Sequence, residues 1–189
     1  AVPGYELSGT IDAVGEGVPE TRLGETVTAL CRFGGYAEQV CVPGGQAFPL
    51  PEGVTLEAAA GPRTRLLMLC SPHNPVGRVF RREELERLVA WCARHDVVLC
   101  SDEIHCGLIL DQDKIHIPTA TLGPEVAART ITFMAPSKTF NLPGLNCGFA
   151  IISDPSLRRT FKNHVHPALP DVNALGTIAC ETAFTQGGR

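Results

Sequence analysis

The sequence predicts an α/β protein in which a mostly parallel sheet with helices follows a β-rich segment. Residues 1–60 are rich in β-branched and apolar residues that glycines interrupt. Residues 61–189 instead alternate short apolar runs with stretches of helical period. We therefore expect two domains, residues 1–60 and 61–189, with the seam near Ala60-Gly61-Pro62.

The first domain is expected to hold three strands. Runs rich in β-branched and apolar residues cover residues 5–14, 25–30 and 36–42. Glycine pairs lie between them, where the backbone takes positive φ at little cost. Residues 55–60 favour a helix that ends at the following Gly-Pro. This pattern is typical of a small barrel or a part of one.

The second domain is expected to alternate strands and helices. The predicted strands are residues 66–69, 97–100, 130–134 and 149–152. Residues 66–69 are a short continuous apolar run, as is typical of strands covered on both faces, and residues 97–100 are expected to be a second buried strand. Residues 81–95 carry an apolar stripe of helical period, and further helices begin at Pro124 and Pro155. Strand–helix–strand units of this length favour parallel pairing.

Composition excludes several classes of partner. The net charge is -4 with no block of like charges, so we expect no nucleic acid and no anionic membrane as partner. No apolar run approaches the roughly 20 residues of a bilayer span, and the first residues lack a signal-peptide pattern. The eight cysteines form no C-x-x-C pair. Buried free thiols in the cytoplasm, with no metal, are the expectation; a disulfide frame or a zinc site is the alternative.

Three polar segments each follow the carboxyl end of a predicted strand. They read SPHNPVG at residues 71–77, SDEIH at 101–105 and APSKTFN at 135–141. In open α/β sheets ligands bind at this edge. Singly, each segment has an ordinary explanation: a turn, a helix cap, a core histidine or a surface lysine.

Together, SPHNPVGRV, SDEIH and APSKTFNLPGL resemble fold-type-I pyridoxal-phosphate (PLP) enzymes, the aspartate aminotransferase superfamily. These sequence segments are most similar to those of the cystathionine β-lyase-like (C–S lyase) branch. The resemblance runs from about Arg65 to the last residue. It implies that residues 61–189 are part of the large domain of a PLP-dependent transferase. It also implies PLP as cofactor and an amino acid as substrate.

The resemblance implies a role for five residues. Lys138 would bind PLP covalently and then move the substrate's α proton. Asp102 would pair with the pyridine nitrogen and keep it protonated. Asn74 would donate to the phenolate oxygen, His105 would lie near the same oxygen, and Ser137 would assist in binding the phosphate.

Some positions depart from the family pattern. Ser71 stands where the family commonly has asparagine, and Asn146 where many relatives have the arginine that clamps the phosphate. We also do not find the upstream phosphate-binding segment or the downstream arginine for the substrate carboxylate. A site incomplete for catalysis is therefore expected, and a folded non-catalytic scaffold is the alternative. If the chain is an enzyme, the resemblance implies a lyase or an aminotransferase.

The first domain resembles a different family. PGYELSGTIDAVGEGV, GGYAEQVCVP and FPLPEGVTLEAAA are similar to the GroES-like domain of medium-chain dehydrogenases/reductases, quinone oxidoreductase type. Tyr5 replaces the histidine of zinc-dependent relatives, and no G-x-G-x-x-G turn is present, so we expect neither zinc nor NADPH. Glu6, Gly35 and Tyr36 are then fold residues.

Two resemblances in one chain imply a chimera. Its β segments are expected to cover the open edge of the second domain's sheet, because an uncovered edge invites aggregation. A homodimer through the same edges is the alternative. A truncated, zinc-free NADPH quinone oxidoreductase-like protein remains a further alternative function.

Overall fold

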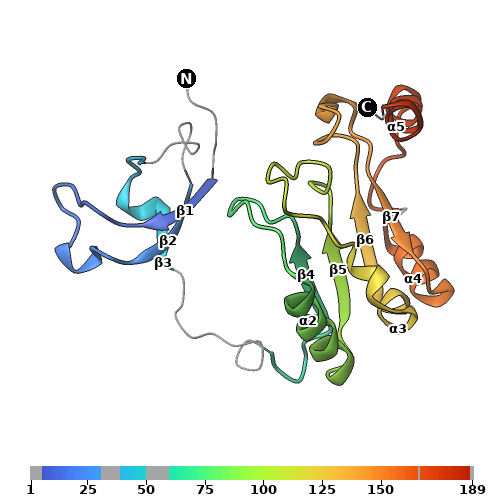
Figure 1. Cartoon of the computed structure of the whole chain (residues 1–189), viewed down its shortest axis with the longest axis horizontal. Helices are drawn as coiled ribbons and strands as arrows, with labels where there is room; N and C mark the ends of the chain where they lie inside the picture. Colours follow the sequence, from blue (N-terminus) through green and yellow to red (C-terminus); the bar gives the residue numbers. More distant parts are fainter. Residues whose placement is uncertain (1–5, 31–38, 50–59, 166, 188–189) are drawn as a thin grey trace. The chain divides into compact units, whose positions relative to one another are not determined.

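The computed structural model describes residues 6–30, 39–49, 60–165 and 167–187 (Figure 1). Contacts within the chain divide it into two compact units, Ala1–Gly61 and Pro62–Arg189. Each unit has its own sheet, so each is described by itself.

The first unit is a three-stranded antiparallel sheet of order β1-β2-β3. Its strands are β1 (Glu6–Thr10), β2 (Thr26–Leu30) and β3 (Ala47–Pro49), with short 3₁₀ turns η1 (Glu20–Arg22) and η2 (Gly44–Gln46) between them. Val27 and Ala29 alternate along β2 toward one face and are buried there with Ala47. This small cluster is the core of the unit.

Two strand predictions in this unit need correction. The run at residues 5–14 is a strand only to Thr10, and residues 39–42 of the predicted third strand are not in a strand; residues 36–38 lie outside the described part. The third strand is β3 instead. The Arg22 guanidinium donates to the carbonyls of Gly44 (3.1 Å) and Ala47 (2.9 Å), which holds this segment beside β2. Of the predicted helix at 55–60, residues 55–59 also lie outside the described part.

The second unit is a four-stranded sheet of order β4-β5-β6-β7. Its strands β4 (Leu66–Cys70), β5 (Val98–Asp102) and β6 (Thr130–Met134) are parallel, whereas β7 (Phe149–Ile152) is antiparallel to β6. The mostly parallel sheet predicted from the sequence is confirmed. The exception is β7, because no crossover helix joins it to β6: the connection carries only the 3₁₀ turn η4 (Pro143–Leu145).

The three helices predicted for this unit are present, a fourth, α5 (Ala174–Gln186), was not predicted, and polar side chains cap the last two of the four. The helices are α2 (Arg82–Arg94), α3 (Pro124–Ala128), α4 (Pro155–Val165) and α5, with a 3₁₀ turn η3 (Thr119–Leu122). The Asp154 carboxylate accepts from the Leu157 N–H at 2.7 Å, and the Asn173 side chain accepts from the Gly176 N–H at 2.8 Å. Both bonds satisfy amides that the first helical turn leaves unpaired.

The sheet of the second unit has two unlike faces. On one face Cys100, Ile131 and Ile152 form a buried cluster, against which Leu157 and Phe161 of α4 pack. Residues of opposite parity along β5, Leu99 and Ser101, are buried on the other face. Asp102 points to the same side of the sheet as Cys100, and Glu103 points to the same side as Ser101. The two neighbouring carboxylates therefore point to opposite sides.

Candidate functional site

Three loops gather at one edge of the second sheet. Because β4, β5 and β6 are parallel, their carboxyl ends lie at the same edge, and the segments that follow them begin there (Figure 1). These are residues 71–81, 103–118 and 135–148. All five residues predicted for the site lie in these loops or at the last position of β5.

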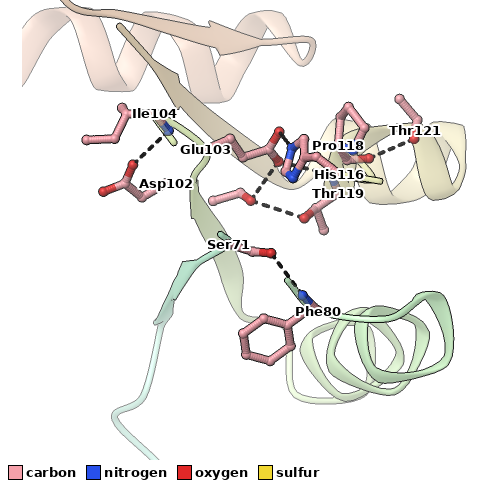
Figure 2. Close-up of polar contacts among 10 residues, drawn as sticks. Ser71, Phe80, Asp102, Glu103, Ile104, His116, Pro118, Thr119 and Thr121 are labelled. Carbon is pink, nitrogen blue, oxygen red and sulfur yellow. Dashed lines mark hydrogen bonds and ion pairs between the residues drawn. The ribbon is translucent and has the colours of Figure 1, made fainter. Parts of the chain in front are cut away.

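Asp102 is the last residue of β5 and is half-buried. Its carbonyl accepts from the Ser71 N–H at 3.0 Å, which extends the pairing of β4 and β5 by one residue. Its Oδ1 accepts from the Ile104 N–H at 3.2 Å (Figure 2). Oδ2 accepts no hydrogen bond from any residue that the structure describes. One carboxylate oxygen is therefore fixed by the backbone and the other is available.

His105 lies within electrostatic range of both Lys138 and Asp102. Burial lowers the pKa of His105, and the positive charge of Lys138 lowers it further, while Asp102 acts in the opposite direction. The imidazole is therefore neutral near pH 7. Its Nδ1 is buried without a hydrogen-bond partner among the described residues, whereas Lys138, in the loop after β6, is exposed.

The loop after β5 also contacts the loop that carries Lys138. A Cβ placed on Gly107 would collide with the side chain of Thr139, the residue after Lys138. Only glycine allows this approach of the two loops. Gly107 therefore helps to hold His105 and Lys138 at neighbouring positions.

Ser137 and Asn74 are placed differently. Ser137 is half-buried in a tight turn, where its carbonyl accepts from the Leu142 N–H at 3.0 Å. Asn74 is exposed in a turn that the His73 N–H closes by donating to the Arg78 carbonyl at 2.8 Å. Among the described residues, no hydrogen bond or ion pair joins either side chain to Asp102, His105 or Lys138. Of the five predicted residues, the structure thus shows an interaction of His105 with Asp102 and with Lys138.

The two departures from the family pattern have clear positions. Ser71 is 2% exposed, and its Oγ accepts from the Phe80 N–H at 3.3 Å (Figure 2), so it fastens the loop after β4 from inside. Asn146 is exposed, with the left-handed φ of 49°, and ends the turn η4. Asparagine tolerates this conformation better than most residues, which is a structural reason for it there.

The sequence did not lead us to expect a role for the buried carboxylate of Glu103, next to Asp102. Glu103 is 2% exposed, and its Oε1 accepts from Ser101 Oγ at 2.8 Å and from the Thr119 N–H at 3.0 Å. Its Oε2 lies 2.8 Å from Nε2 of His116. Figure 2 shows these groups converging from β5, the following loop and the start of η3. The network ties the loop after β5 to the residues that precede α3.

The electrostatics of Glu103 follow from these contacts. Burial alone would raise its pKa, but hydrogen bonds from His116, Thr119 and Ser101 together hold the pKa below its ordinary value. The carboxylate is therefore ionised at neutral pH. Because side chains alternate along a strand, Glu103 is expected to point to the same buried side as Ser101. A buried charge needs hydrogen-bonding partners, so this alternation was the feature of the sequence that could have indicated the network.

The set Asp102, His105 and Lys138 fits the ring end of a PLP molecule. Asp102 offers an unpartnered oxygen for a protonated ring nitrogen, and His105 offers an orphaned polar nitrogen. Lys138 offers an exposed amine. An α/β unit with these groups at the carboxyl edge of its parallel strands has the features that a PLP-binding fold requires.

Comparison with known proteins places the second unit within that class. The aminotransferase class I and II family matches residues 52–183, and the chain belongs to this family. The alcohol dehydrogenase GroES-like domain matches residues 1–52. Both resemblances seen in the sequence are thereby confirmed, as is the fold class.

Individual relatives agree with this assignment. Cystathionine beta-lyase PatB of Bacillus subtilis is 41% identical over 128 residues, which are 67% of this chain and 33% of that enzyme. The crystal structure of OvoB has a TM-score of 0.67 at 44% identity, over 69% of this chain and 35% of that one. Cystalysin of Treponema denticola, a structure that contains pyridoxal 5'-phosphate, has a TM-score of 0.62 at 38% identity, over 66% and 32%. The chain spans about a third of the length of these relatives.

Two further properties concern membranes and metals. None of the helices in the described part of the chain is long and apolar enough to cross a bilayer. Within the same residues no three histidine, cysteine, aspartate or glutamate side chains are grouped to hold a metal ion.

Proposed function

We propose that this chain carries the PLP-binding core of a C–S lyase or aminotransferase-like enzyme, with an amino acid as substrate. The observation that supports it best is the convergence of Asp102, His105 and Lys138 at the carboxyl edge of the sheet. The match to the aminotransferase class I and II family, residues 52–183, includes all three residues.

Each residue of the site would contribute a defined step. PLP, when bound, supplies an electron sink for the carbanion of an amino acid. The Asp102 carboxylate would keep the ring nitrogen protonated, and His105 would donate to or accept from the ring oxygen. Lys138 would hold the cofactor covalently and then move the proton at the substrate's α carbon. Asn74 and Ser137 are proposed to contact the phenolate oxygen and the phosphate.

We further propose that these loops suffice for attaching PLP but not for turnover. A substrate carboxylate needs a cation, and the cations in the three loops have other partners. Arg78 lies 2.6 Å from Glu84, which also pairs with Arg81, and Lys114 lies 2.7 Å from Asp113. Lys138 itself is needed for the cofactor. We thus propose a core that binds PLP but does not turn over a substrate. We also propose the domain boundary between residues 60 and 61 and a cytoplasmic location.

The test is PLP titration followed by borohydride reduction and peptide mass spectrometry. We expect one reduced adduct on Lys138, which blocks tryptic cleavage there, and its loss in Lys138→Ala. The matched control is Lys162→Ala, an exposed lysine on α4, which should keep the adduct. Equal labelling of both lysines, or labelling that survives Lys138→Ala, would refute cofactor binding at this site.

Two further measurements separate the alternatives. Release of pyruvate from cystathionine or cysteine would contradict the proposal that turnover is missing. Protection against thermal unfolding by NADPH would support the quinone-oxidoreductase alternative, and we expect none, because the sequence has no dinucleotide-binding turn.

A further inference from the structure

Two thiols that the PLP site does not use lie against each other in the second unit. Cys147 precedes β7, and Cys180 lies in the middle of α5. The two thiols lie within the range at which each affects the protonation of the other. Both are half-buried, whereas Cys92 and Cys100 are buried, so a small reagent in solvent can reach this pair.

Contacts on both sides of the pair fix its geometry. At one end of α5, Asn173 Nδ2 donates to the Leu145 carbonyl at 3.0 Å, and a Cβ on Gly176 would come within 2.6 Å of the same oxygen. At the other end, the rings of Phe184 and Phe149 have centroids 5.7 Å apart. The helix is therefore pinned to the chain before β7 at two points.

The midpoints of the two pinned segments are the two cysteines. From Gly176 to Phe184 a helix advances about 12 Å, and from Leu145 to Phe149 a chain advances at most about 13 Å. Cys147 and Cys180 are therefore the middle residues of two segments that contact each other at both ends, which agrees with the interaction between the two thiols.

We propose that Cys147 and Cys180 form a disulfide-forming pair that a low-molecular-weight disulfide, such as oxidised glutathione, converts to an intramolecular bond. The thiolate of one cysteine attacks the glutathione disulfide, forms a mixed disulfide and releases one glutathione. The second protein thiolate then attacks the protein sulfur of the mixed disulfide and releases the second glutathione. Two electrons and two protons pass from the protein thiols to the reagent.

The reaction has an expected pH dependence. Burial raises the pKa of Cys180, and its contact with Cys147 raises it further. Cys180 therefore keeps its proton near neutral pH. Because thiolates are the attacking species, we expect the bond to form faster as the pH rises.

The sequence makes the product easy to identify. Trypsin cuts after Lys138, Arg158 and Lys162, so Cys147 is the sole cysteine of residues 139–158 and Cys180 the sole cysteine of residues 163–189. The chain is treated with oxidised glutathione, remaining thiols are alkylated, and the digest is analysed by mass spectrometry. We expect these two peptides joined, at the sum of their masses less two hydrogens, and separated by dithiothreitol.

Matched variants and a denatured control decide the outcome. Cys147→Ser and Cys180→Ser should each abolish the joined peptides, whereas Cys70→Ser, another half-buried thiol, should leave their yield unchanged. In urea the same treatment should join several cysteines without this preference. Stable glutathione adducts on both peptides in the native chain, an equal yield in urea, or a covalent dimer on a non-reducing gel would overturn the proposal.

Discussion

Replacing Glu103 by alanine should destabilise the second unit strongly. The side chain is 2% exposed and accepts hydrogen bonds from Ser101 and Thr119, besides its contact with His116. Without it, the Thr119 N–H and His116 Nε2 lose their partner, at about 1–3 kcal/mol each when no water replaces it, whereas Ser101 Oγ keeps Thr119 Oγ1 at 3.1 Å. Since such losses are not additive, we expect a loss of about 2–5 kcal/mol.

The assay is urea unfolding followed by tryptophan fluorescence. The chain has one tryptophan, Trp91, which is 3% exposed in α2, so the signal reports on the unit that contains Glu103. The loss appears as a lower midpoint at an unchanged slope. Glu103→Gln keeps the volume and one acceptor oxygen, so it should lose only about 1–2 kcal/mol.

A matched control uses a carboxylate that lacks the network. Glu86 is exposed on α2 and lies 3.7 Å from Arg82, so Glu86→Ala should change the free energy of unfolding by less than about 1 kcal/mol. If Glu103→Ala unfolds at the same urea concentration as Glu86→Ala, the network does not stabilise the unit as argued. Equal losses in Glu103→Ala and Glu103→Gln would refute the role given to hydrogen-bond acceptance.

Two other predictions concern pH and the loop contact. The folded-state pKa of Glu103 lies below its ordinary value of 4.5, so its stabilisation is complete above pH 4.5 and is lost as the pH falls through the folded value. The difference in unfolding free energy between the wild type and Glu103→Gln should therefore shrink in acid; a constant difference would contradict it. Gly107→Ala should cost about 1–3 kcal/mol and weaken PLP labelling of Lys138, because its Cβ meets Thr139. Adding Thr139→Ala to Gly107→Ala should recover part of the stability and part of the labelling. A double variant that is no more stable and no better labelled than Gly107→Ala would refute the contact.

Local pattern was enough to predict most of the second unit. Its strands are short segments rich in apolar and β-branched residues, and α2 and α4 have apolar stripes of helical period, so these elements could be found from their own residues. Helix α5 has no such stripe, because its apolar residues are spread around the whole helix. Its large apolar side chains Leu175, Ile178 and Phe184 are all exposed. The sequence of α5 therefore did not indicate which side of the helix packs against the rest of the unit.

The site was predictable to the same depth. The rule that ligands bind where parallel strands end led us to expect Asp102, His105 and Lys138 at one edge of the sheet, and their role as a site stays a prediction. The contacts of Glu103 with His116 and Thr119 were not predictable, because they depend on how the chain returns after a long loop. The antiparallel direction of β7 was missed for a similar reason: it depends on a connection without a helix, which apolar runs do not reveal.

The antiparallel pairing of β6 and β7 has a consequence for the order of folding. Met134 pairs with Phe149, close in the chain, whereas Leu66 must find Val98 across the whole of α2. Closing the shorter loop costs less chain entropy, so this hairpin is the natural early structure of the unit. The loop it closes is the one that carries Lys138. The lysine thus becomes positioned by a local event, and the rest of the parallel sheet assembles onto it.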